Sequence, residues 1–143
     1  MTEREVREYV NAIKVELENL IKKLSEIDEL RTIAENCTVR TDKDCVQTSG
    51  AGDKMSKVVG RIVDLEREAA RLRESYTQRK KTVLEKSQKL KNKRHSEYLE
   101  VRYVDCNSFY NTVMIMDLSD STARRIDRKA ISELTQIFNE SDV

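Results

Sequence analysis

The first quarter of the chain carries apolar residues at alternating steps of four and three positions, without interruption. The members of this seam are Val6, Val10, Ile13, Leu17, Leu20, Leu24 and Ile27. Such spacing places all seven on one side of an α-helix, while charged residues fill most positions between them. The pattern predicts a helix of coiled-coil type over about residues 3–35, which has to bury its seam against another helix.

A second apolar stripe predicts another long helix over about residues 53–88, and polar and glycine residues predict a loop over 36–52. The members of the stripe are Met55, Val58 or Val59, Ile62, Leu65, Ala69, Leu72, Tyr76, Val83 and Leu90. Within residues 1–90, the two helices can form an antiparallel hairpin that buries both seams. Alternatively, the first seam pairs between two copies of the chain and forms a homodimer.

Composition favours an all-α fold. The 143 residues include no proline and only three glycines, and 37% of them are charged, which suits long helices better than strands and tight turns. Two phenylalanines, five tyrosines and no tryptophan are too few aromatic residues for a large globular core. We therefore expect burial along narrow seams between helices.

Residues 91–143 are predicted to form a small helix-turn-helix module, joined to the hairpin through the basic stretch 89–96. Its first helix is expected over 96–104, and Phe109, Val113 and Met116 share one face of the next. A module of about 50 residues is too small to be robust alone. We therefore expect it to pack on the hairpin or on a second copy of itself.

The turn and the last helix carry their own local signals. Asp117 tolerates a left-handed backbone better than most residues, and Ser119 is a favourable N-cap. Leu118, just before that cap, is placed to act as a hydrophobic staple. The last helix has an apolar stripe, whose members are Ala123, Ile126, Ala130 and Leu134. Two helices, a tight turn and a basic outer face are the geometry that enters a DNA major groove.

The sequence from Arg102 onward resembles the promoter-reading domain of sigma-70-type factors. The matching residues are Arg102-Tyr103-Val104-Asp105, Ser108-Phe109, Leu118-Ser119, Ser121-Thr122 and Arg124-Arg125. Together with residues 46–55 and 62–66, they are similar to phage late-gene transcription regulators of the RinA and ArpU type, over roughly residues 10–138. The chain departs from this pattern at Asp117 and Cys106, where glycine is usual, and at residues 111–113, which replace Glu-Ile-Ala.

The resemblance implies a phage-type transcriptional regulator that binds double-stranded promoter or operator DNA. The residues expected to contact DNA are Ser119, Ser121, Thr122, Arg124, Arg125, Arg128 and Lys129. The first turns of a recognition helix reach base edges, while residues further along meet phosphate. Asp120 opposes phosphate contact, although it suits the helix dipole. The basic run 79–94 either extends the DNA footprint or is a solvated helix face.

The sequence offers little for catalysis, and we expect no enzyme, cofactor or metal site. His95 is the only histidine and stands among lysines and arginines, where a solvated linker side chain is the ordinary interpretation. Residues 50–54 lack the spacing of a phosphate-binding loop. Cys37, Cys45 and Cys106 have no metal-ligand spacing, and although Cys37 and Cys45 lie near enough in sequence to bridge, we expect free thiols.

No apolar run reaches the ~20 residues of a membrane span, and charged residues crowd the first positions, as no signal peptide would. We therefore expect a cytoplasmic protein without membrane contact, in the bacterial host if it is phage-encoded. RNA polymerase or another protein is a further expected partner. The competing hypothesis is a protein-binding helical module, such as an inhibitor of a host or defence protein, in which the helix-turn-helix is vestigial or autoregulatory.

Overall fold

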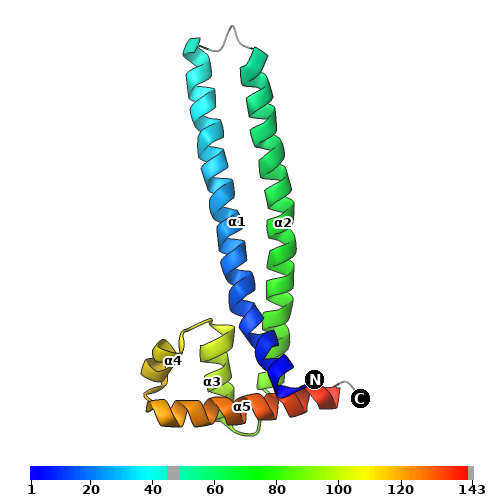
Figure 1. Cartoon of the computed structure of the whole chain (residues 1–143), viewed down its shortest axis with the longest axis vertical. Coiled ribbons are helices and arrows are strands. Elements are labelled where there is room, and N and C mark those ends of the chain that lie inside the picture. Colours follow the sequence, from blue (N-terminus) through cyan, green and yellow to red (C-terminus); the bar gives the residue numbers. More distant parts are fainter. Residues whose placement is uncertain (45–48, 142–143) are drawn as a thin grey trace. The chain divides into compact units, whose positions relative to one another are not determined.

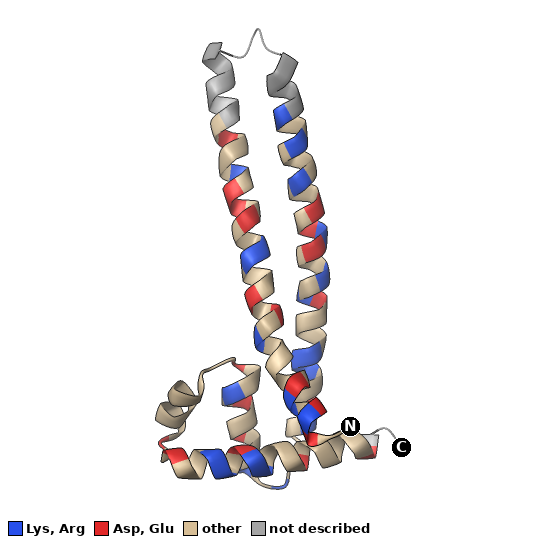
Figure 2. Ribbon diagram, in the orientation of Figure 1, with Lys and Arg blue, Asp and Glu red and all other residues tan. Residues whose placement is uncertain are grey.

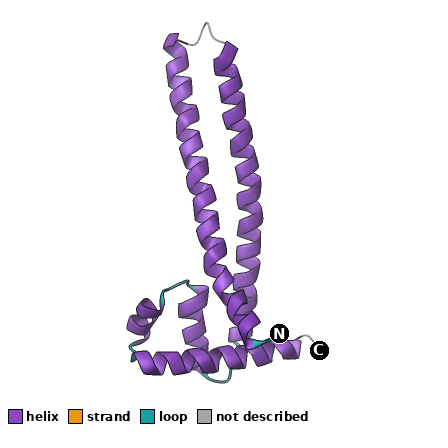
Figure 3. Cartoon of the chain, in the orientation of Figure 1, coloured by secondary structure: helices purple, strands orange, loops and turns teal. Residues whose placement is uncertain are grey.

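The computed structural model describes residues 1–44 and 49–141, with side chains described for 1–36 and 54–140, and every element in these ranges is helical (Figures 1 and 3). The elements are α1 (Glu3–Asp44), α2 (Ser49–Ser87), α3 (Lys93–Leu99), the π-helical segment η2 (Glu100–Val104), α4 (Phe109–Met116) and α5 (Asp120–Ser141). The all-α prediction is confirmed.

The two long helices extend further than the sequence indicated. We expected them over 3–35 and 53–88 with a loop over 36–52, but α1 continues to Asp44 and α2 begins at Ser49. The β-branched residues near position 38 weaken helix propensity without stopping a helix, because no proline follows them. Cys37 and Cys45, and with them any bridge between their side chains, lie outside the residues whose side chains are described.

The chain divides into two compact units, one of residues 1–16 and 75–143 and the other of residues 17–74. This division differs from the expected boundary at residue 90. The first part of α1 and the last part of α2 belong to the same unit as the C-terminal module. A module of about 50 residues is marginal when isolated, and this one shares its buried core with residues of α1 and α2. It therefore packs on the hairpin, which is the first of the two possibilities that the sequence left open.

The core of the first unit joins α1, α2 and the C-terminal helices. Val6, Val10 and Ile13 of α1 and Val83 of α2 are buried in one cluster with residues of the C-terminal module. The module supplies Tyr98, Leu99, Tyr103, Val104, Leu118, Ala123, Ile126, Ala130, Ile131, Leu134 and Phe138. The ring of Tyr9 meets Phe138 edge-on at 5.4 Å between centroids. The basic surface of α5 thus lies on a core to which α1, α2 and the C-terminal helices all contribute.

The second unit is a two-helix segment with a narrow seam. Leu20 and Ile27 of α1 are buried with Leu65 and Ala69 of α2. Ion pairs flank this seam, from Lys23 to Glu68 at 2.8 Å, from Arg31 to Glu66 at 2.6 Å and from Arg61 to Glu26 at 4.0 Å. These exposed pairs add little stability, so the apolar seam holds the unit together.

Five of the seven seam residues predicted at the interface are buried within the single chain, namely Val6, Val10, Ile13, Leu20 and Ile27. Leu17 is half-buried and Leu24 is 37% exposed. The seam therefore closes inside one chain, as the hairpin alternative required. Its buried members have their apolar partners without a second copy.

Candidate nucleic-acid interface

The turn between α4 and α5 has the backbone geometry that the sequence suggested. Asp117 is left-handed, with φ 52° and ψ 55°, and its amide donates to the carbonyl oxygens of Met114 and Val113. The amide of Leu118 donates to Val113 at 3.0 Å. This is the Schellman pattern that ends many helices, usually with glycine at the left-handed position. Cys106, the other position where the sigma-like pattern has glycine, is also left-handed, with φ 58°.

The start of α5 is capped by Ser119, as predicted. Its hydroxyl accepts from the Thr122 amide at 3.3 Å and donates to the Thr122 hydroxyl at 2.7 Å. Leu118, the residue before the cap, is buried in the core. The hydroxyls of Ser119 and Thr122, both expected at the DNA surface, are thus already engaged with one another. Ser121 is exposed, and its hydroxyl lies 3.4 Å from that of Ser119.

Further along α5, apolar and basic residues separate onto different sides. Ala123, Ile126, Ala130 and Leu134 are buried, as the stripe predicted. The basic side chains are exposed and have no carboxylate within ion-pair distance in the described part of the chain; they are Arg124, Arg125, Arg128 and Lys129. Figure 2 shows blue lysine and arginine positions along the ribbon of α5. We call these four residues the basic face of α5. The exposed Asp120 precedes them in the first turn.

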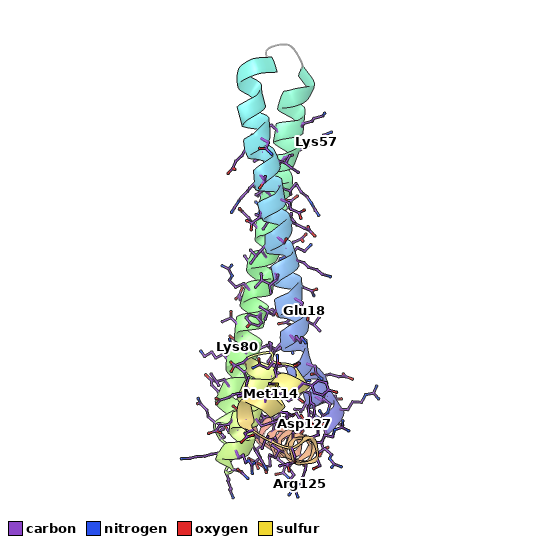
Figure 4. The ribbon with its side chains drawn as sticks, turned by 90° about the vertical axis from the view of Figure 1, so that its left-hand side faces the viewer. Glu18, Lys57, Lys80, Met114, Arg125 and Asp127 are labelled. Atoms are coloured by element: carbon purple, nitrogen blue, oxygen red, sulfur yellow. The ribbon has the colours of Figure 1, made fainter. Side chains whose placement is uncertain are left out.

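The four residues of the basic face point in two different directions around the axis of α5. Successive helical residues turn by 100°, so Arg125 and Asp127 lie 200° apart, and Figure 4, which looks along α5, shows them on opposite sides. Arg124 turns toward α4, where its guanidinium carbon lies 5.7 Å from the centre of the Phe109 ring. Arg125 and Lys129 face outward, whereas Arg124 and Arg128 border the rest of the first unit.

Arg124 and Arg128 line a cavity of about 570 Å³ in the first unit, which we call the arginine cavity. Its other two arginines are Arg7 of α1 and Arg102 of η2. The remaining lining residues are Tyr98, Tyr103, Phe109 and Asp127. Four guanidinium groups against one carboxylate make the cavity strongly positive. No local sequence pattern indicated this cavity, because its lining residues come from five elements.

Asp127 holds one side of this cavity. It accepts from the Tyr103 hydroxyl at 2.6 Å and from Arg7 at 2.7 Å, and Arg7 also donates to the Tyr103 oxygen at 3.2 Å. Burial and then the hydrogen bond to Asp127 raise the pKa of Tyr103 well above its ordinary value. Burial alone would lower the pKa of Arg7, but Asp127 raises it overall. Helices α1 and α5 and segment η2 are thereby joined by one charged network.

Tyr98 lines the same cavity and is fully buried. Its hydroxyl has no hydrogen-bond partner among the described residues. Burial, and secondly the charge of Asp127, raise the pKa of Tyr98. Asp127 also contributes to this shift as an acceptor near the hydroxyl, although the two groups do not meet in hydrogen-bond geometry.

The interpretation of His95 as a solvated linker residue was wrong. Asn92 ends the linker by capping α3, and His95, in the first turn, is buried. Its Nδ1 lies 2.9 Å from Glu133 Oε1 of α5. The surrounding lysines and arginines concealed a helical face, because His95 shares one side of α3 with Tyr98 and Leu99 at spacings of three and four.

The basic run 79–94 serves partly as structure. Arg79 pairs with Glu16 at 3.0 Å and covers the Tyr9 ring at 4.2 Å. Lys86 lies 4.6 Å from the centre of the Phe138 ring. The exposed members, which remain available to a polyanion, are Lys81, Lys89, Lys91, Lys93 and Arg94.

The outer face of α4 is apolar, which sequence reasoning missed. Tyr110, Met114 and Ile115 are 72%, 78% and 59% exposed. Their spacing placed them opposite Phe109, Val113 and Met116, which pack against the core. An amphipathic helix normally has polar residues on its outer side. Three large apolar residues on the outer side of α4 were therefore the sequence feature that could have indicated this face.

Comparisons with protein-family models, with curated proteins and with solved structures find no significant match to this chain. Among the described residues, no group of three or more histidine, cysteine, aspartate or glutamate side chains is placed to bind a metal ion. No helix in the described ranges combines the length and apolarity needed to cross a bilayer.

Proposed function

We propose that the chain is a phage-type transcriptional regulator that binds double-stranded DNA, with α5 as the recognition helix of a helix-turn-helix. The observation that carries this proposal is the basic face of α5, which follows directly on a capped turn and has no carboxylate partner among the described residues. Guanidinium groups in the first turns of such a helix reach base edges, and those further along meet phosphate. Arg125 is the leading candidate for a base contact, because it is exposed and faces away from the core.

The resemblance of residues 102–125 to promoter-reading domains supports the same assignment and suggests that the DNA is a promoter. Under this proposal the protein acts in the cytoplasm of a bacterial host, where RNA polymerase is an expected partner. A homodimer on DNA would use surfaces other than the buried seam. A palindromic binding site would indicate such a dimer, since two-fold symmetric proteins bind half-sites about one helical turn apart.

The first experiment is selection of bound duplexes from a random pool at near-physiological salt, followed by sequencing. We expect an enriched motif. On that motif, Arg125→Ala should weaken binding by about 5- to 150-fold, equivalent to one lost base contact of about 1–3 kcal/mol. Lys91→Ala removes one exposed charge outside α5 and is the matched control.

The control variant should weaken binding uniformly across sequences and only slightly, as the loss of a phosphate contact does. Circular dichroism melts of both variants establish that they fold. An unenriched pool, or equal effects of Arg125→Ala and Lys91→Ala on the affinity, would refute sequence-specific binding through α5.

A second candidate function, a protein-binding helical module, is favoured by exposed apolar residues in the second unit. Ile21, Leu24, Ile33, Val59 and Val63 are all 37–56% exposed. A protein partner recognised by this unit would be retained by a chain with the basic face changed to alanine and lost by the double variant Ile21→Ser, Val63→Ser. Affinity capture from host cells, with both variants in parallel, distinguishes this function from DNA binding.

A further inference from the structure

The arginine cavity has more positive charge than the DNA-binding proposal uses. Asp127, the one carboxylate among the described residues that line it, is already engaged by Arg7 and Tyr103. The other three guanidinium groups, those of Arg102, Arg124 and Arg128, have no ion-pair partner among the described residues. Like charges that line one cavity repel each other, and a bound anion relieves that repulsion.

The arginines also have the geometry for a particular anion. A guanidinium presents its donors in a planar fork that matches the oxygens of phosphate two at a time. Arg102 is anchored, because its Nη1 donates to the Asn107 carbonyl at 2.6 Å and its guanidinium lies 5.2 Å from the centre of the Tyr103 ring. Arg124 is positioned by the Phe109 ring. Among the side chains that line the cavity, the acceptors are the Asp127 carboxylate and the hydroxyls of Tyr98 and Tyr103.

Size and lining indicate that the ligand carries more than a phosphoryl group. A volume of about 570 Å³ falls in the range of pockets for organic ligands, roughly 300–1,000 Å³, and far exceeds what a phosphate ion fills. Half-buried Phe109 offers a ring surface, and the buried Tyr98 hydroxyl is an unsatisfied donor beside the cavity. A ligand with an aromatic ring and a polar edge uses both features.

We propose that the arginine cavity binds a nucleoside diphosphate, with Arg102, Arg124 and Arg128 on its phosphate oxygens. Two of these arginines also belong to the basic face of α5. Occupation of the cavity therefore withdraws Arg124 and Arg128 from DNA phosphates, and the ligand acts as a negative effector of DNA binding. This last consequence rests on the proposed function, whereas ligand binding itself does not.

The test of the site uses the full chain without DNA and isothermal titration calorimetry with ADP, adenosine and inorganic phosphate as probes. ADP is expected to bind once per chain and about tenfold or more tightly than either adenosine or phosphate. Absence of ADP binding would overturn the proposal. Phosphate binding as tight as that of ADP would overturn the assigned ligand class, because the organic part would then contribute nothing.

Two variants on the same helix separate the cavity from general charge. Arg128→Gln removes a guanidinium that lines the cavity and has no hydrogen bond or ion pair in the described structure, so the fold is expected to survive. It should weaken ADP binding by about tenfold or more. Arg125→Gln removes the same charge from the outward side and should change the affinity by less than about twofold. Equal losses in the two variants would show nonspecific attraction and refute the site.

The effector role is tested by measuring duplex affinity with and without saturating ADP. We expect ADP to weaken DNA binding of the wild-type chain and to have little effect on Arg128→Gln. ADP binding that leaves DNA affinity unchanged would refute the effector role, while the proposal of a binding site would stand. ADP binding by a chain that binds no DNA would instead refute the proposed function, so the two failures are distinguishable.

Discussion

Tyr103 and Asp127 are joined by a hydrogen bond of 2.6 Å, although one lies at the end of a π-helical segment and the other in the middle of α5. Arg7, from the first turns of the chain, completes the contact from the opposite carboxylate oxygen. Asp127 is mostly buried and Arg7 is partly exposed. The contacts of Asp127 with Tyr103 and Arg7 fix the orientation of α5, and with it the basic face, relative to the N-terminal turns of α1.

Asp127→Asn is expected to lower the free energy of unfolding by about 1–2 kcal/mol. The charged hydrogen bonds weaken while the shape is kept, and the partial exposure of Arg7 limits the loss. Urea unfolding followed by circular dichroism measures it. Asp105→Asn, at an exposed carboxylate, is the control and should stay within about 0.5 kcal/mol of the wild type. Equal free energies of unfolding for Asp127→Asn and Asp105→Asn would mean that the network contributes no stability.

Alkaline pH is expected to destabilise the first unit through its buried tyrosines. The pKa values of Tyr98 and Tyr103 are raised above the ordinary value of 10.0, so the folded chain holds protons that the unfolded chain releases. The stabilisation is complete below pH 10 and is lost as pH rises through the folded-state pKa, by up to about 1.4 kcal/mol per pH unit for each tyrosine.

Urea unfolding between pH 8 and pH 11 follows this effect. Tyr103→Phe should flatten the decline in stability above pH 10, because one of the two groups no longer titrates. Tyr110→Phe removes an exposed tyrosine and is the matched control. A Tyr103→Phe profile parallel to that of the wild type would contradict the assignment.

Asp117→Gly is expected to stabilise the chain by up to about 1 kcal/mol. The residue is left-handed, with φ 52°, and glycine adopts that conformation without the cost that a side chain imposes. Asp105 ends η2 with an ordinary φ of −82°, so Asp105→Gly should instead destabilise by about 0.5–1 kcal/mol. Thermal unfolding compares the two. A loss of stability at Asp117→Gly would show that its carboxylate has a structural role.

The seam of the second unit can be tested by paired leucine truncations. Leu65 is fully buried and Leu24 is partly exposed. Leu65→Ala should therefore cost about 2–4 kcal/mol and Leu24→Ala less than about 1 kcal/mol, since only the first leaves a cavity. Urea unfolding of both variants gives the comparison. Equal losses would indicate that Leu24 is buried in solution, for example against a second chain.

Asp120→Asn is expected to strengthen DNA binding several-fold at low salt. The exposed carboxylate lies in the first turn of α5, beside the basic face, and repels the phosphate backbone. The gain should shrink as salt increases. Fluorescence anisotropy with a labelled duplex measures it, and Glu140→Gln near the other end of α5 is the control. Weaker binding by Asp120→Asn would instead indicate that the carboxylate accepts from a cytosine amino group.

Local features of the helix-turn-helix could be predicted because they depend on neighbours in sequence. The cap at Ser119 and the left-handed Asp117 follow from the chemistry of single residues, and both are present. His95 was misjudged because its partner, Glu133, is 38 positions away. Helical spacing predicts an apolar outer face on α4 once the side of that helix that packs against the core is known.

The sequence alone determined that this chain is helical, where α4 ends and α5 begins, and which residues of α5 are buried or basic. These properties follow from helical periodicity and from contacts within one or two turns. Only the tertiary structure decided that Val6, Val10 and Ile13 pack with the C-terminal module, and that Arg7 reaches Asp127 across 120 positions. Side chains distant in sequence meet through the packing of whole helices, and no local pattern records which seam will meet which. The arginine cavity arises from that packing, so it was visible only in the folded chain.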